Sequence, residues 1–144
     1  MKQDFTQDLK EGEQYQELVS NMLFIELKLP IFCYNNKEDQ LTHGENPQGW
    51  EIKFDRMYSS TGNIYIETET YGHIDGIYKK NCNSWIWVIG NYDRFFIFSR
   101  KTLQKMHQSG KFRQVVNKYD SSSGFLISDA EAREYAEKVI EVSK

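Results

Sequence analysis

The chain has 144 residues and a net charge of −3, with 39% hydrophobic, 15% aromatic and 27% charged residues. This composition is typical of one globular domain with its own hydrophobic core, and it excludes a disordered chain. No segment approaches the roughly 20 apolar residues of a membrane span, and the start, Met1-Lys2-Gln3-Asp4, lacks the apolar region of a signal peptide. Two cysteines, Cys33 and Cys82, are too few for a disulfide framework or a four-sulfur zinc site. We therefore expect a cytoplasmic protein with reduced cysteines and no membrane contact.

Local periodicity predicts the order of the elements. A helix is expected where apolar residues recur every three or four positions, and a strand where apolar and polar residues alternate. A short polar turn between the first two strands favours a hairpin, and the uniformly apolar third strand should be central in its sheet. The predicted elements are a helix over 6–27, a loop over 35–49, strands over 50–55, 64–69, 85–89 and 94–99, a helix over 102–108, a short strand over 125–127 and a helix over 128–142.

Two of the predicted helices carry start signals. Thr102 is placed to cap one of them, with Gly110 after its end. Ser128 and Glu131 form the Ser-x-x-Glu pattern of a capping box at the last helix. The chain contains no internal repeat and no linker. The element order therefore predicts an α/β or α+β layer fold with a mixed sheet, in a single domain over residues 1–144.

The predicted hairpin concentrates acidic residues. Asp55 ends the first strand, with Glu51 and Lys53 on its side. Glu67 and Glu69 are two residues apart and are expected on one face of the partner strand. Like charges on one face repel unless water or a cation neutralises them, and Mg²⁺ prefers oxygen ligands, typically one or two carboxylates plus a substrate phosphate. Two interpretations follow: a divalent-metal site, or a hairpin whose charged side faces the solvent.

An Asp that ends one strand, followed twelve residues later by Glu67-Thr68-Glu69 on the next, matches a known nuclease pattern. These residues resemble the motif of the PD-(D/E)XK nuclease superfamily, and the segment from Thr61 to Glu69 is similar to a phage-type subgroup. The resemblance covers residues 8–103. It implies a restriction-endonuclease-like fold, with a central mixed sheet of four to five strands flanked by helices.

The resemblance also implies a catalytic centre. Asp55 and Glu67 would ligate Mg²⁺, for which Mn²⁺ would substitute, and Glu69 would ligate a second ion or orient the attacking water. Glu17, which follows Gly12 in the first helix, would supply the acidic residue that the family carries there. The ion would lower the pKa of a water that attacks phosphorus and would stabilise the leaving oxygen.

Two residues depart from the family pattern. Phe54 stands where the family commonly has Pro, and Glu69 stands in the position of the motif lysine. Lys53, on the same strand face as Asp55, could supply a migrated ammonium group. Lys79 and Lys80 are further candidates for that group.

A basic segment follows the proposed site. Residues 94–119 contain seven Lys or Arg and no Asp or Glu. Such a segment is either a solvated face or a surface that binds the phosphate backbone. The second interpretation predicts DNA contacts from Arg100, Lys101, Lys105, Lys111 and Arg113.

Together these features predict a Mg²⁺-dependent endonuclease that hydrolyses phosphodiester bonds in DNA, encoded by a phage and acting on branched, recombining or foreign DNA in the host cytoplasm. A homodimer is expected where the substrate is two-fold symmetric. Glu69 in the lysine position keeps a second prediction open, a catalytically inactive nuclease-fold domain that binds nucleic acid or protein. A third is an interaction protein whose acidic hairpin is only surface.

Overall fold

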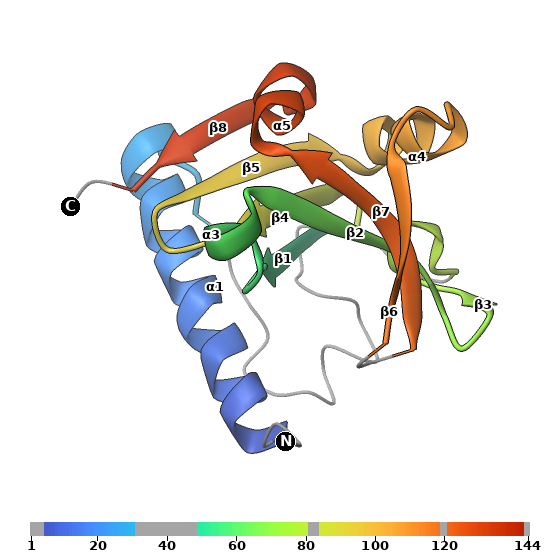
Figure 1. The fold of residues 1–144 in the computed structure, drawn as a ribbon. Coiled ribbons are helices and arrows are strands. Elements are labelled where there is room, and N and C mark those ends of the chain that lie inside the picture. Colours follow the sequence, from blue (N-terminus) through green and yellow to red (C-terminus); the bar gives the residue numbers. More distant parts are fainter. Residues whose placement is uncertain (1–4, 31–48, 81–83, 119–120, 143–144) are drawn as a thin grey trace.

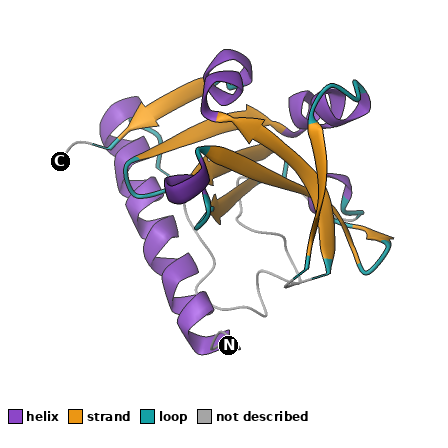
Figure 2. Ribbon diagram, in the orientation of Figure 1, coloured by secondary structure: helices purple, strands orange, loops and turns teal. Residues whose placement is uncertain are grey.

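The computed structural model describes residues 5–30, 49–80, 84–118 and 121–142. They form an α+β fold with two four-stranded sheets (Figures 1 and 2). In chain order the elements are α1 (Phe5–Leu27), β1 (Trp50–Phe54), α3 (Tyr58–Thr61), β2 (Asn63–Thr70), β3 (His73–Ile74), the 3-10 helix η1 (Gly76–Tyr78), β4 (Ile86–Gly90), β5 (Arg94–Ser99), α4 (Arg100–Gln108), β6 (Arg113–Asn117), β7 (Ser122–Ser128), α5 (Asp129–Tyr135) and β8 (Lys138–Glu141). Both cysteines, and all of the predicted loop over 35–49 except Gly49, lie outside the described residues. Within those residues, no helix has the length and apolarity to cross a membrane.

The eight strands divide into two sheets. Sheet A has the spatial order β1-β4-β5-β8, and sheet B has the order β3-β2-β7-β6. In sheet A, β1 pairs parallel with β4, and the remaining neighbours are antiparallel. Sheet B is antiparallel throughout. Strand β4 lies inside sheet A and is buried along its whole length, which confirms the prediction from its apolar sequence.

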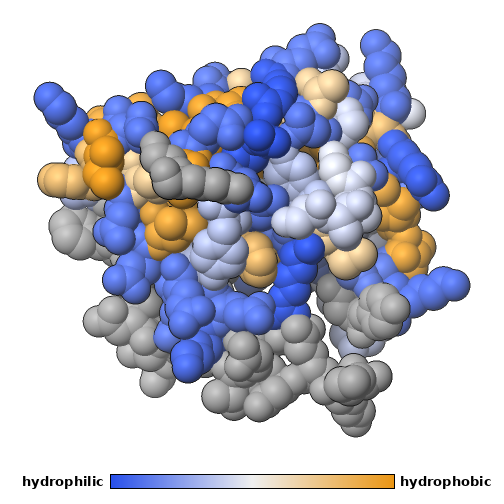
Figure 3. All heavy atoms as spheres, turned by 60° about the vertical axis from the view of Figure 1, so that its left-hand side comes forward, coloured by the Kyte–Doolittle hydropathy of each residue, from blue (hydrophilic) through white to orange (hydrophobic). Residues whose placement is uncertain are grey.

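Two hydrophobic cores define three layers. Tyr15 and Leu23 of α1 share the first core with Val88 of β4, so α1 covers one face of sheet A. Phe96 of sheet A and Phe125 of sheet B share the second core, between the two sheets. The layer order is therefore α1, sheet A, sheet B, and α1 runs along one side of the molecule in Figure 1. On the face shown in Figure 3, apolar side chains form separate patches among hydrophilic ones.

The predicted hairpin of residues 50–55 and 64–69 is wrong, although both strands are present. Strand β1 pairs with β4, and β2 pairs with β7. The segment between β1 and β2 forms the short helix α3, which ends at Gly62 with a left-handed φ of 73°. An isolated two-stranded ribbon is only marginally stable in water. Each strand instead joins a four-stranded sheet that has a hydrophobic core on at least one face.

The last helix begins as predicted and ends early. Ser128 and Glu131 form the capping box in full. The helix ends at Tyr135, not at Val142, because residues 138–141 form β8 on the edge of sheet A. Pairing with β5 gives the backbone of this segment hydrogen-bond partners and buries Ile140. A helix that continued into solvent would leave Ile140 exposed.

The remaining differences concern helix caps and short elements. The N-cap of helix α4 is Ser99, and not the predicted Thr102. The Ser99 hydroxyl accepts a hydrogen bond from the backbone N–H of Thr102. Strands β3 and β6 and the helix η1 were not predicted. Each is short, and none of them shows a clear periodicity in the sequence.

Candidate functional site

Asp55 is a backbone cap at the junction of the two sheets. It directly follows β1, and its backbone N–H donates to the carbonyl of Gly90 at 2.8 Å. Its Oδ1 accepts the N–H groups of Met57 and Tyr58 at 3.0 and 3.1 Å. Its Oδ2 accepts the N–H of Tyr65, in β2, at 2.8 Å. Backbone donors therefore take three of the roughly four lone-pair positions of this carboxylate.

Burial and hydrogen bonding act on the Asp55 carboxyl in opposite directions. The residue is 8% exposed. Burial raises its pKa above the ordinary value of 3.8, and the backbone N–H groups of Tyr65, Met57 and Tyr58 lower the pKa by less. Because these donors belong to the α3 turn and to β2, the carboxylate holds that turn against the start of β2.

Glu67 and Glu69 lie on opposite faces of β2, so the prediction that they share a face is wrong. Glu67 is opposite Gly124 of β7, whereas Glu69 is opposite the adjacent Ser123, because a β-bulge shifts the register between them. Adjacent residues of β7 point to opposite faces of the sheet. The metal-ligand roles predicted for the two glutamates depended on an alternation that the bulge interrupts.

The bulge brings Glu67 to Thr70 instead. Thr70 Oγ1 lies 2.6 Å from Glu67 Oε1 and 2.8 Å from Asp75 Oδ2. A hydroxyl carries one proton and can donate to only one of these carboxylates at a time. Asp75 Oδ1 accepts the N–H of Gly76 at 2.9 Å and caps η1. Asp75 is thus an acidic neighbour of Glu67 that the motif did not indicate; only its Asp-Gly turn pattern pointed to a structured position.

Lys53 is engaged with a buried carboxylate. Glu51 is 4% exposed, and the Nζ of Lys53 lies 2.8 Å from its Oε1. The two residues share a face of β1, as their spacing predicts. The ammonium group expected to assist at Asp55 therefore neutralises Glu51. Lys79 and Lys80, the other candidates, are exposed after η1.

The helical acid that contacts the Asp55 segment is Glu11, and not the predicted Glu17. Glu11 Oε2 lies 2.6 Å from the guanidinium of Arg56. Glu17 is exposed on α1, the helix that covers the outer face of sheet A. Glu67 lies on the outer face of sheet B, because it alternates with the buried residues of β2. The two carboxylates are therefore on opposite sides of the layered fold. Helical spacing could have found Glu11, since it lies one turn before Tyr15 on the buried side of α1.

The predicted Mg²⁺ ligands do not fit a common ion in this arrangement. The Asp55 carboxylate is bound by backbone donors, and Glu67 and Glu69 point to opposite sides of one strand. Within the described ranges, no three His, Cys, Asp or Glu side chains are grouped so that they could hold a metal ion. The geometry supports no catalytic step through Mg²⁺ or Mn²⁺.

Arg100 is used inside the protein. Its guanidinium donates to the backbone carbonyls of Ile77, Lys79 and Ser84 at 2.7, 2.8 and 3.3 Å. These bonds tie the start of α4 to the segment after η1 and to the residue two before β4. The predicted contact of Arg100 with phosphate therefore competes with three internal hydrogen bonds.

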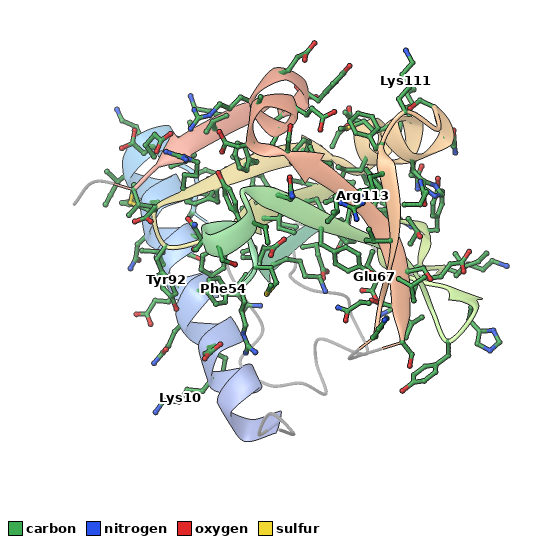
Figure 4. All side chains as sticks on the ribbon, viewed as in Figure 1. Lys10, Phe54, Glu67, Tyr92, Lys111 and Arg113 are labelled. Carbon is green, nitrogen blue, oxygen red and sulfur yellow. The ribbon has the colours of Figure 1, made fainter. Side chains whose placement is uncertain are left out.

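The other four predicted nucleic-acid contacts form what we call the basic surface: Lys101, Lys105, Lys111 and Arg113. All four are exposed. None of them forms an ion pair within the described part of the chain. Lys101 and Lys105 are one turn apart on α4. Figure 4 shows Lys111 at the end of the α4 segment and Arg113 on β6, on the side of the molecule opposite Lys10.

A recess of about 310 Å³ lies beside the second half of the basic surface. Lys111 and Arg113 line it together with Asn63, Ser128 and Glu131. The Glu131 carboxylate accepts the N–H of Ser128 at 2.9 Å as part of the capping box. The cations of this recess are thus not neutralised by its carboxylate, which is directed to the helix end.

A second recess, of about 500 Å³, is lined by three members of a ring of four paired charges, namely Arg94, Asp129 and Glu141. Arg94 Nε lies 3.0 Å from Glu141 Oε1, and Arg94 Nη1 lies 3.6 Å from Asp129 Oδ1. Arg133 Nη2 lies 3.2 Å from Glu141 Oε1, and Arg133 Nε lies 2.8 Å from Asp129 Oδ2. The Tyr58 hydroxyl also donates to Asp129 and is the main reason that the pKa of this carboxyl is lowered. Two cations and two anions neutralise one another, and the ring joins β5, α5 and β8.

Comparisons of this chain with protein-family models, with curated proteins and with solved structures find no match.

Proposed function

We propose that this chain binds nucleic acid through the basic surface, and does so without an assembled metal centre. The observation that carries the proposal is the exposure of Lys101, Lys105, Lys111 and Arg113 without an acidic partner in the described structure. Cations that are not paired internally can neutralise phosphates and release their counterions, which favours binding. The net charge of −3 does not oppose this, because the distribution of charge decides where a polyanion binds.

The proposal retains the resemblance to PD-(D/E)XK nucleases as a restriction-endonuclease-like domain over residues 1–144 that binds DNA. Its motif carboxylates serve the fold instead of an ion. Asp55 caps the α3 turn, and Glu67 bonds to Thr70 next to Asp75. This is the inactive-domain alternative that Glu69 in the lysine position left open.

A second candidate, the Mg²⁺-dependent endonuclease, is favoured by one contact. The hydrogen bond from Tyr65 to Asp55 places this carboxylate against β2, the strand that carries Glu67 and Glu69. For catalysis, Asp55 would have to exchange backbone donors for an ion, and the bulge would have to be rearranged.

One titration tests the proposed function. Binding of a fluorescein-labelled 20-base-pair duplex and of the matching single strand is measured by anisotropy in EDTA, from about 50 to about 300 mM NaCl. We expect the logarithm of the association constant to fall with the logarithm of salt, by roughly 0.9 per phosphate contact on duplex and roughly 0.7 on single strand. Lys101→Gln with Lys105→Gln, and separately Lys111→Gln with Arg113→Gln, should lower that slope.

Lys10→Gln is the matched control, since Lys10 is exposed on α1 on the opposite side of the molecule. An unchanged slope in both double variants, or no binding at about 50 mM NaCl, would overturn the proposal. The same samples with Mg²⁺ or Mn²⁺ test the nuclease. If the parent chain cleaves DNA, and both Asp55→Asn and Glu67→Gln abolish this cleavage, the chain is a metal-dependent nuclease and the proposal of an inactive binding domain is wrong.

A further inference from the structure

Trp85 is a large aromatic residue whose side chain is exposed on the surface. It is 58% exposed, whereas Trp87, two residues later and inside β4, is 4% exposed. Trp85 directly precedes β4 and so lies beyond the end of the core between the sheets. Exposed Trp and Tyr side chains are enriched where another molecule covers them.

Arg100 links the backbone at Trp85 to two segments that carry lysines. Its backbone N–H donates to the carbonyl of Trp85 at 2.8 Å, and its guanidinium donates to the carbonyl of Lys79 at 2.8 Å. Lys80 follows Lys79, and Lys101 follows Arg100; all three lysines are exposed. The described segments 76–80, 84–85 and 99–108 contain no Asp or Glu.

We propose that Trp85 stacks on an unpaired base of a single-stranded nucleic acid while Lys79, Lys80 and Lys101 contact the phosphates on either side of it. This rests on the proposed function and names its substrate class. A protein that binds single strands combines cations along the backbone with aromatic rings under the bases. In a duplex the base faces are already stacked on one another, so an exposed indole has no base face to cover. The arrangement therefore favours a single strand and is tolerant of sequence, since every base has a π-face.

The test compares three probes of equal length: a labelled dT12, the same backbone made abasic, and a duplex. The full chain should bind dT12 more tightly than the abasic strand. Trp85→Ala should weaken dT12 binding by roughly tenfold to hundredfold and leave abasic binding unchanged. Trp85→Phe, which keeps an aromatic ring, should retain part of the preference for dT12 over the abasic strand. Lys79→Gln with Lys80→Gln should weaken both single strands alike and lower the salt slope by roughly 0.7 per lost contact.

Tyr71→Ala is the matched control, because Tyr71 is 74% exposed at the β2–β3 turn, outside this surface. It should leave all affinities unchanged, and thermal unfolding of each variant confirms that the fold is intact. Equal binding of dT12 by Trp85→Ala and the parent chain would overturn the inference. The proposed function would still stand if the double variants of the basic surface lowered the salt slope of binding. Absence of binding to every probe would overturn both, and binding of poly-glutamate with the same dependence on Trp85 would assign the surface to an acidic polypeptide.

Discussion

The carboxylate of Asp55 accepts a hydrogen bond from the backbone N–H of Tyr65 at 2.8 Å, although the strands β1 and β2 belong to different sheets. The bond uses an edge of β2 that does not pair with β7. It also gives the motif aspartate a role in folding that competes with a role in metal binding.

Removal of this carboxylate should destabilise the fold. In Asp55→Ala, the N–H groups of Met57, Tyr58 and Tyr65 lose their acceptor, and buried donors left without one are costly. We expect a loss of roughly 2–4 kcal/mol in the free energy of unfolding, with a smaller loss in Asp55→Asn, which keeps one oxygen. Urea unfolding monitored by circular dichroism measures both. Equal stability of the parent chain and Asp55→Ala would show that the cap contributes nothing.

The raised pKa of Asp55 predicts a pH dependence of known sign. When the folded-state pKa lies above the unfolded value, the neutral form is the favoured one in the fold. Its contribution is complete below the ordinary pKa of 3.8 and is lost as the pH rises through the folded-state pKa. The free energy of unfolding of the parent chain minus that of Asp55→Asn should therefore fall as the pH is raised above the ordinary pKa of 3.8. A difference that rises with pH would mean that hydrogen bonding outweighs burial.

Arg100→Lys should separate a structural arginine from a phosphate contact. A lysine ammonium cannot reach the three carbonyls that the planar guanidinium spans. We expect about 1–3 kcal/mol of lost stability, because the carbonyl groups of Ile77, Lys79 and Ser84 each lose a donor. At a temperature where the variant is folded, the salt slope of duplex DNA binding through the basic surface should equal that of the parent chain, because Arg100 is not one of its four cations. A reduced slope would restore Arg100 to the DNA contacts.

Gly124→Ala should be among the most damaging small substitutions in sheet B. A Cβ at Gly124 would lie 2.1 Å from the carbonyl oxygen of Ile66 and 2.9 Å from the ring of Tyr65. Because a backbone atom cannot move aside without disturbing the β2–β7 pairing, we expect a loss of about 2 kcal/mol or more. Gly12→Ala is the opposite control: its Cβ meets no atom within 4 Å, and in helix α1 it should stabilise the chain by roughly 0.5–1 kcal/mol. Similar melting temperatures for the two variants would contradict this packing.

The prediction of local elements succeeded where the signal is short-range. Helix α1, strands β1, β2, β4 and β5 and the Ser128–Glu131 capping box follow from periodicity and capping, which neighbouring residues determine by themselves. The four exposed cations of the basic surface were also identified from the sequence, because a run without acidic residues can be read directly.

Pairing and site geometry were decided by contacts between distant segments. The sequence could not reveal that β1 prefers β4 to β2, since both partners offer backbone hydrogen bonds and only the four-stranded sheet offers a core. It could not reveal the bulge that turns Glu69 away from Glu67, because alternation assumes a regular strand. Nor could it distinguish the end of a helix from strand β8, because residues 138–141 find their partner β5 more than forty positions earlier.

The sequence by itself therefore determined the composition class, most of the elements and the location of the positive charge, all of which depend on neighbours along the chain. Only the tertiary structure decided which group each of these carboxylates contacts. Asp55 meets the backbone, Glu67 meets Thr70 beside Asp75, and Glu11 meets Arg56. The physical reason is that a side chain's partner is set by the register and stacking of whole sheets, which burial of the shared core selects.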